Sequence, residues 1–294
     1  MNILITGAAS GFGNLIVTDL IKAGHRVVGS VRDADGRNAE AVQNLQELGA
    51  DVIEIDVTND QSVEQGVAEA QARVGGIDVL INNAGVGAHG LQENFSAADF
   101  QHLFDVNVFG IQRMIRATLP EMRGRGSGLI LNISSLLGRV VMPFYGPYNA
   151  SKWAVEAMSE NYRVELSQFG VDVALIEPGG FPTRFFGNLM HPASNDRDSG
   201  YGEMAAAPKA ALEGFADFLT EHPEQAPQLV ADAVLAVVNA APGTRPFRTE
   251  VDRVGMGDLI KPMNDQAREV TETLFTNFGM GHMLTLKVGE TKAA

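Results

Sequence analysis

The sequence predicts a doubly wound α/β fold, in which helices cover both faces of a parallel sheet of about seven strands. Short runs rich in β-branched residues alternate with stretches of helical period through the first two-thirds of the chain. These short runs are continuously apolar, which is typical of strands buried on both faces. Because parallel connections are right-handed, a ligand crevice is expected at the carboxyl ends of the strands.

The predicted elements follow one another along the chain. Strands are predicted at 2–6, 26–31, 51–55, 77–81, 128–133, 171–176 and 246–251. Helices are predicted at 11–24, 60–73, 99–120, 148–169, 205–220, 226–241 and 258–278. The segment between the last long strand and the next helix is rich in Gly, Pro, Asn, Asp and Ser, and a loop of this length is predicted to be a substrate lid.

One domain is predicted over 1–294, because the chain shows neither an internal repeat nor a linker. Within it, residues 1–178 should form the dinucleotide-binding and catalytic core. Residues 179–294 should supply the substrate-binding loop and a C-terminal segment. The last stretch, 279–294, is expected either to cover a neighbouring subunit or to fray.

Composition excludes several classes of function. The net charge of −14 argues against binding to nucleic acid or to an anionic membrane, since both need clustered Lys and Arg. The chain has no cysteine, and its six histidines lack the spacing of metal ligands, so no metal site is predicted. Without a basic leader or an apolar run of ~20 residues, the chain is expected to be soluble and cytoplasmic.

A glycine-rich turn joins the first predicted strand to the first predicted helix in "NILITGAASGFG". Gly7, Gly11 and Gly13 allow a tight turn, close approach of the backbone to a pyrophosphate, and close packing of helix on strand. The helix N-terminus would add N–H donors for the phosphates. The alternative is a plain loop between a strand and a helix.

The end of the second strand bears on which dinucleotide fits. An acid there would bond the ribose 2′-hydroxyl of NAD, whereas an arginine accommodates the 2′-phosphate of NADP. Val31 stands where the acid is expected and Arg32 follows it, which favours NADP(H). Asp33 keeps NAD(H) open, because it would take the ribose role if the strand ended two residues later.

Polar residues follow the next two predicted strands as well. Asp56 is placed to accept from the adenine amino group, or else it is a turn-former ahead of Thr58. The "NNAG" stretch at 82–85 would shape the floor beneath the cofactor, although an Asn-rich turn reads the same way.

The stretch "GPYNASKWAVEAM" places Tyr148 and Lys152 one helical turn apart on one face of a helix. A half-buried tyrosine beside a snorkelling lysine would explain the pair structurally. The chemical alternative is that the ammonium stabilises a phenolate, because a free phenol ionises near pH 10 and is otherwise a poor base at neutral pH.

Five motifs together resemble the short-chain dehydrogenase/reductase family. They are "TGAASGFG" (6–13), "NNAG" (82–85), "NISS" (132–135), "YNASK" (148–152) and "PGGFPT" (178–183), and the resemblance covers about residues 1–185. It implies a Rossmann-like sheet of strand order 3-2-1-4-5-6-7, an NAD(P) cofactor, and an enzyme that interconverts CH–OH and carbonyl groups. It also implies a homodimer or homotetramer paired through the helices at 99–120 and 148–169.

The resemblance assigns roles residue by residue. The catalytic positions fall on Ser135, Tyr148, Lys152 and Asn107. The cofactor-binding positions, with Arg32 added from the argument above, are Gly7, Ser10, Gly11, Phe12, Gly13, Arg32, Asp56, Val57, Asn83, Ala84, Gly85, Tyr148, Lys152, Pro178, Gly179 and Thr183. Ser134 is the alternative to Ser135, but the thirteen-residue gap from Ser135 to Tyr148 matches the family pattern.

These roles define an expected reaction. Tyr148 would give its proton to the carbonyl oxygen in reduction and take it back from the alcohol in oxidation. Ser135 would hold the substrate oxygen, Lys152 would bind the nicotinamide ribose, and Asn107 resembles family residues that hold a water leading to the lysine.

Apolar side chains in the predicted lid suggest the substrate. They are Phe181, Phe185, Phe186, Leu189, Met190 and Met204, and the alternative is that several of them pack against the body of the fold. A bulky apolar or aromatic ketone or secondary alcohol is therefore expected. An NAD-dependent alcohol or hydroxysteroid dehydrogenase and a non-catalytic NADP(H)-binding sensor remain the other candidate functions.

Overall fold

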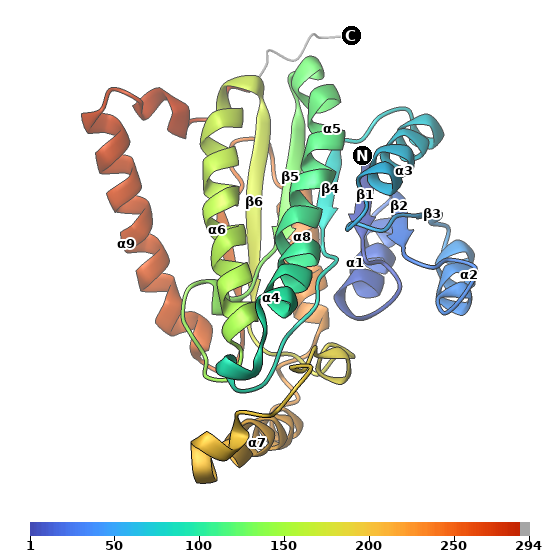
Figure 1. The fold of residues 1–294 in the computed structure, drawn as a ribbon. Helices are drawn as coiled ribbons and strands as arrows, with labels where there is room; N and C mark the ends of the chain where they lie inside the picture. The colour runs from blue at the N-terminus through green and yellow to red at the C-terminus, as the bar shows by residue number, and fades with distance from the viewer. Residues whose placement is uncertain (289–294) are drawn as a thin grey trace.

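The computed structural model describes residues 1–288 and has one parallel sheet at its centre (Figure 1). The strands are β1 (Asn2–Thr6), β2 (Arg26–Val31), β3 (Asp51–Glu54), β4 (Val79–Asn82), β5 (Gly128–Ile133), β6 (Val171–Pro178) and β7 (Arg248–Val251). They pair in the order β3-β2-β1-β4-β5-β6-β7. The predicted fold class and strand order are confirmed.

Helices cover both faces of the sheet. They are α1 (Gly11–Lys22), α2 (Ala39–Glu47), α3 (Asp60–Val74), α4 (Ala97–Phe104), α5 (Gly110–Arg125), α6 (Gly146–Leu166), α7 (Ala207–Glu221), α8 (Gln228–Asn239) and α9 (Met256–Asn277). Side chains of β1 alternate between the two layers: Ile3 and Ile5 pack with α1 and α8, while Leu4 packs with α3, α5 and α6. The strands are thus buried on both sides, as their apolar composition predicts.

The predicted helix at 99–120 is divided in two. A Ser96–Asp99 capping box starts α4, and a π-helical turn over Asp105–Phe109 separates α4 from α5. The wider turn carries Asn107, whose side chain is buried. The helix α2 is not among the predicted elements, although it is amphipathic, with Leu45 as its buried side chain.

The segment after β6 crosses the carboxyl ends of the strands and is anchored partway along its length. An isolated bridge joins Ala88 to Met190, where the His89 N–H donates to the Met190 carbonyl (2.9 Å) and the Met190 N–H donates to the Gly87 carbonyl (2.8 Å). Beyond this bridge the chain reaches α7, which lies past one end of the sheet (Figure 1).

The C-terminal helix α9 runs along the outer side of α6 (Figure 1). After α9, the chain returns to the C-terminal end of α6 in the same molecule. There the Gln168 side chain donates to the His282 carbonyl (2.8 Å), and the Lys287 N–H donates to the Ser167 carbonyl (2.8 Å). The predicted alternatives for 279–294 extend past residue 288, outside the described residues. Within 1–288, no helix is both long and apolar enough to cross a membrane.

Candidate active site

The glycine turn lies between β1 and α1, at the carboxyl edge of the sheet. Gly7 and Gly11 have positive φ angles of 70° and 56°, which favour glycine. A Cβ on Gly13 would overlap the Gly7 carbonyl oxygen, so only glycine permits this packing of helix on strand. Asn83 secures the turn from β4, because its side-chain amide donates to the Thr6 carbonyl (2.9 Å) and the Gly7 carbonyl (3.1 Å).

The first turn of α1 fits an anionic group. Ser10 is the N-cap residue in extended conformation, and its side chain makes no capping hydrogen bond. The first N–H groups of a helix need partners from outside the helix, and together with the helix dipole they attract a phosphate. Thr183 from the segment after β6 approaches this turn, within 3.9 Å of a Cβ built on Gly11. The residues present therefore fit the pyrophosphate of a dinucleotide.

The ends of β2 and β3 place charged residues beside the turn. Arg32 directly follows β2 and is exposed. Asp33 has a positive φ of 54°, accepts from the Arg37 N–H (3.1 Å) and pairs with the Arg37 guanidinium (3.8 Å). Asp33 is thereby engaged within its own turn, although its side chain is 52% exposed, as Arg32 is also exposed at the strand end.

Asp56 stands at the end of the neighbouring strand. Its Oδ1 accepts from the Thr58 N–H (3.0 Å) and the Thr58 hydroxyl (2.7 Å), so the turn-forming interpretation of Asp56 describes real contacts. Burial raises the pKa of Asp56, but the Thr58 hydrogen bonds and the charges of Arg32 and Arg113 bring it below its usual value. The next residue, Val57, packs against the start of α5 at Gly110.

The remaining cofactor positions surround the same edge. The Ala84 N–H donates to the Thr6 hydroxyl (3.0 Å). A Cβ built on Gly85 would lie 3.9 Å from Lys152 Nζ. Phe12 meets Phe181 edge to face, with centroids 5.6 Å apart. A Cβ on Gly179 would lie 2.5 Å from Asp252 Oδ1, so the segment after Pro178 has no room for a side chain there.

Ser135, Tyr148 and Lys152 converge on one buried site between β5 and α6. The Ser135 hydroxyl donates to the Pro178 carbonyl (3.4 Å) and accepts from the Leu137 N–H (3.1 Å). Lys152 Nζ donates to the Ile133 carbonyl (2.8 Å) and lies 5.6 Å from the centroid of the Tyr148 ring. The helical spacing of the tyrosine and lysine thus places both at the carboxyl end of β5.

The acidity of this tyrosine differs from the expectation that Lys152 lowers it. Burial raises the pKa of Tyr148 to about 12; a hydrogen bond with Ser135 opposes this rise, and the nearby Tyr145 adds to it. Burial also lowers the pKa of Lys152 to about 8, against the charge of Glu156. In this low-dielectric site both groups are driven toward their neutral forms, so burial outweighs the attraction between ammonium and phenolate.

Asn107 joins the site through the π-helical turn. Its Oδ1 accepts from the Val86 N–H (2.9 Å), while its Nδ2 donates to the Val86 carbonyl (2.8 Å) and the Ser151 hydroxyl (3.1 Å). It ties the loop after β4 to α6 next to Lys152. Ser134, the alternative to Ser135, has a buried hydroxyl without a hydrogen-bond partner within residues 1–288.

A cavity of about 340 Å³ opens above Ser135 and Tyr148. Aromatic side chains form one wall: Phe185 packs on Tyr148 with centroids 5.5 Å apart, Phe186 packs on Phe185 at 5.6 Å, and Phe215 of α7 packs on Phe186 at 5.6 Å. Phe181, Phe185 and Phe186 line the cavity as predicted. The prediction is wrong for three other residues, since Leu189 and Met190 do not line the cavity and Met204 is 53% exposed.

The sequence did not predict several of the residues that line the cavity. They are Leu137, Met142, Phe144, Tyr145, Ala211, Phe215 and Met256. Three of them, Ala211, Phe215 and Met256, come from α7 and α9, far along the chain, and no local pattern links those helices to the catalytic residues. The run "MPFYG" ahead of α6 offered the one usable signal, because it is apolar and directly precedes the Tyr148 motif. No group of His, Cys, Asp and Glu within residues 1–288 could hold a metal ion.

Comparison with known proteins gives the family. The sequence model described as short chain dehydrogenase matches residues 1–193. Retinol dehydrogenase 8 of Bos taurus is 34% identical over 251 residues, or 81% of this chain and 78% of its own. A 3-ketodihydrosphingosine reductase of Bacteroides thetaiotaomicron is 40% identical over 186 residues, and the match spans 63% of this chain and 66% of that protein.

Solved structures agree with these relatives. A short-chain dehydrogenase from Streptomyces avermitilis superposes with a TM-score of 0.75 and 31% identity, covering 95% of this chain and 97% of that chain. A Burkholderia phymatum short-chain dehydrogenase/reductase in complex with NAD has a TM-score of 0.75, with 27% identity over 91% of this chain and 94% of its own. An actinorhodin polyketide ketoreductase with NADPH has a TM-score of 0.71, with 27% identity over 87% and 97%. Neighbours of this chain thus bind NAD or NADP. The chain belongs to the short-chain dehydrogenase/reductase family and is an NAD(P)-dependent oxidoreductase acting on CH–OH groups.

Proposed function

We propose that the protein is an NADP(H)-dependent carbonyl reductase for bulky apolar or aromatic ketones and aldehydes, with Tyr148 as the proton donor. The observation that carries this proposal is the Tyr148 phenol, which lies in an apolar cavity with its pKa raised to about 12. Such a phenol holds its proton at neutral pH, and it is still a stronger acid than the alcohol product, so it can protonate the alkoxide that forms when a carbonyl is reduced. The oxidative direction would instead require a phenolate, which burial disfavours.

Each residue of the site has a role in this proposal. The dinucleotide, when bound, supplies the hydride. Ser135 donates a hydrogen bond to the carbonyl oxygen and holds it within reach of Tyr148, which then gives up its proton. Lys152, as an ammonium, binds ribose hydroxyls and favours departure of the proton from Tyr148. Asn107 fixes the loop beside Lys152 and holds a water on the proton path.

The preference for NADP(H) rests on the end of β2. Arg32 is presented there and acts electrostatically on Asp56 across the edge of the sheet. A guanidinium suits a 2′-phosphate because of its planar fork of donors. The competing ribose ligand, Asp33, is bonded to Arg37 within its turn, and that contact would have to break before Asp33 met a ribose hydroxyl.

The substrate class follows from the lining of the cavity. Lys152 contributes the one charged side chain among the described lining residues, so a carboxylate or phosphate on the substrate would find no second cation there. The aromatic wall from Phe185 to Phe215 favours flat or extended apolar groups. Two relatives are called a retinol dehydrogenase and a 3-ketodihydrosphingosine reductase.

The deciding experiment measures NADPH and NADH consumption side by side over a panel of carbonyls, from small aliphatic ketones to bulky aromatic and polycyclic ones. We expect turnover with NADPH, with kcat/KM rising as the apolar group grows. A preference for NADH, with faster oxidation than reduction, would point instead to an NAD-dependent alcohol or hydroxysteroid dehydrogenase. Binding of a dinucleotide without turnover of any substrate would favour the non-catalytic sensor and overturn the proposal.

We also propose that two copies pair through α5 and α6, as the family resemblance implies. Large apolar side chains are exposed on or beside these helices, Phe109 to 50% and Trp153 to 43%. Light scattering after size exclusion is expected to give a dimer or tetramer. A monomer at micromolar concentration would contradict this proposal.

A further inference from the structure

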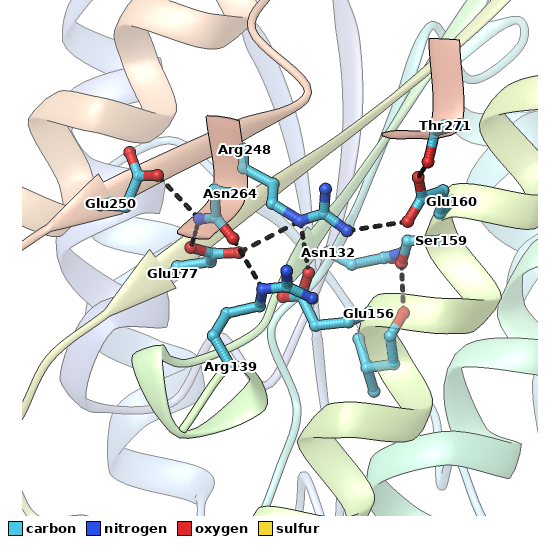
Figure 2. A network of polar contacts seen from close by, with 11 residues as sticks. Asn132, Arg139, Glu156, Ser159, Glu160, Glu177, Arg248, Glu250, Asn264 and Thr271 are labelled. Carbon is cyan, nitrogen blue, oxygen red and sulfur yellow. Dashed lines mark hydrogen bonds and ion pairs between the residues drawn. The ribbon is translucent and has the colours of Figure 1, made fainter. Parts of the chain in front are cut away.

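A buried cluster of charged side chains lies between β6, β7, α6 and α9 (Figure 2). Arg248 opens β7 with its side chain 6% exposed. Its Nε donates to Glu156 Oε2 (2.8 Å) and lies 3.4 Å from Glu177 Oε1, while its Nη2 donates to Glu160 Oε2 (3.0 Å). One guanidinium thus bridges carboxyl groups from a helix and from a strand.

Acids outnumber cations in this cluster. Asn264 of α9 donates to Glu177 Oε2 (2.7 Å) and to Glu250 Oε1 (2.7 Å), and it accepts from Arg139 Nε (2.6 Å). With Glu156 and Glu160, four carboxyl groups face the guanidiniums of Arg248 and Arg139. Burial and the charge of Glu156 raise the pKa of Glu177 to about 8. Glu177 therefore keeps its proton at neutral pH, and Arg248 is left to the helix carboxylates.

The cluster adjoins the active site through Glu156. This residue stands one turn after Lys152 on the same face of α6, and both side chains are buried, to 2% and 6% exposure. The short turn after β5 closes over them: a Cβ on Gly138 would lie 3.0 Å from Glu156 Cγ and 3.1 Å from the Lys152 carbonyl. Glu156 Oε1 is buried and has no hydrogen-bond partner within residues 1–288. One carboxylate oxygen is thus held by Arg248, and the other accepts no hydrogen bond within residues 1–288.

We propose that Glu156, clamped by Arg248, is a positioning residue that keeps Lys152 in its ammonium form and so sets the pH range of proton transfer at Tyr148. The role of Tyr148 belongs to the proposed function, so the link from Lys152 to proton transfer rests on that function. A buried lysine tends to lose its proton, and a fixed carboxylate one turn away opposes that loss. Arg248 has the complementary task of holding the Glu156 carboxylate in place without itself contacting Lys152.

The other groups around Lys152 are not charged. The strand β5 contributes the Ile133 carbonyl, the π-helical turn contributes Asn107, and α6 contributes Tyr148 beside Glu156. Beyond Glu156, the charged groups of the cluster within residues 1–288 are Arg248 and Glu250 from β7, Glu177 from β6, Glu160 and Arg163 from α6, and Arg139 from the turn after β5. Glu156 is the nearest carboxyl group along α6, so its removal should act on Lys152 directly.

The test is a direct titration of Lys152 in the protein without cofactor. The chain has six lysines, so ¹³C labelling at Cε gives few NMR signals, and the Lys152→Arg variant identifies the one from Lys152. We expect a wild-type midpoint near pH 8. In Glu156→Gln it should fall by about one pH unit. This titration needs no substrate, so failure of the proposed reaction would leave its result readable.

Glu160→Gln is the matched control. Glu160 lies on the same helix and bonds the same arginine, but it is one turn farther from Lys152 and its side chain is 31% exposed. We expect the Lys152 midpoint in Glu160→Gln to stay near the wild-type value. Glu156→Asp keeps the charge, so its Lys152 midpoint should lie much closer to wild type than that of Glu156→Gln. Equal shifts in the two Gln variants, or no shift in Glu156→Gln, would overturn the inference.

A second experiment applies if the Glu156→Gln variant does not fold. Removing both charges, as Glu156→Gln with Arg248→Gln, leaves no unpaired ion from that pair. The Lys152 midpoint should again fall, and an unchanged midpoint would count against the inference. In the active enzyme, the alkaline limb of kcat for carbonyl reduction should move to lower pH with the Lys152 midpoint, while kcat at pH 6 stays within about twofold of wild type. A uniform loss of kcat at every pH would indicate a merely structural role.

Discussion

Lys152 lies over the ring of Tyr148, with Nζ 5.6 Å from the ring centroid, yet its hydrogen bond goes to the Ile133 carbonyl at 2.8 Å. The ammonium is therefore fixed beside the phenol by the backbone of β5. Its position suits a ribose ligand that touches both groups, while the buried phenol stays protonated. In the function we propose, this pair donates a proton to substrate rather than storing a phenolate.

Replacing Tyr148 by Phe should lower kcat on the order of 10²–10⁴-fold, because the proton donor is lost while the ring and its packing on Phe185 remain. Binding of NADPH, followed by its fluorescence, should change little. Tyr145→Phe is the control, since Tyr145 lines the same cavity and should keep most of the activity. Activity close to wild type in Tyr148→Phe would remove this residue from the mechanism.

Replacing Arg32 by Ala should raise KM for NADPH about tenfold or more and leave KM for NADH within twofold, because the guanidinium meets only the 2′-phosphate. Arg37→Ala tests the neighbouring cation, which is 58% exposed and pairs with Asp33. Initial rates with each coenzyme at saturating substrate give both constants. If Arg32→Ala changes KM equally for NADPH and NADH, the proposed contact of Arg32 with the 2′-phosphate is wrong.

Gly13→Ala should destabilise the protein by at least about 2 kcal/mol, since the new methyl group would overlap the Gly7 carbonyl oxygen. Gly124→Ala is a matched control, because a Cβ there meets nothing within 4 Å and alanine favours the helix α5 by up to about 1 kcal/mol. Urea unfolding gives both free energies. Equal stability of the two variants would show that the turn relaxes around the methyl group.

Phe215→Ala should raise KM for bulky aromatic ketones several-fold and leave small aliphatic ketones nearly unaffected, because it removes part of the cavity wall. Phe218 stacks on Phe215 with centroids 6.0 Å apart but is not among the lining residues, so Phe218→Ala is the control. The contrast is read from kcat/KM over the carbonyl panel. The same loss for large and small substrates would place the substrate elsewhere.

Glu177→Gln should stabilise the protein at pH 8 by on the order of a few kcal/mol relative to wild type and much less at pH 5. The pKa of Glu177 is raised from 4.5 to about 8 in the folded state. The stability that its bound proton contributes is fully present below pH 4.5 and is lost as the pH rises toward 8. Melting temperatures at the two pH values measure the difference, with exposed Glu64→Gln as control. An equal effect at both pH values would contradict the assigned protonation.

The sequence was sufficient where local pattern and spacing decide the structure. The doubly wound parallel sheet follows from apolar strands and right-handed connections, the strand order was implied by the resemblance to the family, and the tyrosine-lysine pair follows from helical spacing. The π-helical turn at Asn107 was not predictable, because "DVNVF" has no breaker and reads as ordinary helix. The helix α2 was missed although it is amphipathic, because it has only nine residues and is shorter than the helical stretches that the sequence predicted.

The acidity of the site and the shape of the cavity depend on tertiary contacts. The sequence shows that Lys152 is near Tyr148, but the sign of the shift at Tyr148 is set by how fully both are buried. Phe215 and Met256 reach the cavity from helices about 70 and 110 residues beyond Tyr148, which no short-range pattern encodes. The Arg248 cluster likewise joins residues nearly a hundred positions apart.

The bridge between Ala88 and Met190 divides the long segment after β6 into two loops of different freedom. The cost of closing a loop grows with the logarithm of its length, so anchoring Met190 leaves only the short piece from Gly179 to Leu189 to be ordered over the cofactor. Phe185 and Phe186 lie on that short piece. Insertions and substitutions between Pro192 and Ala206 can therefore accumulate during evolution without moving Phe185 and Phe186, and the protein can change its outer surface while keeping this part of the cavity wall.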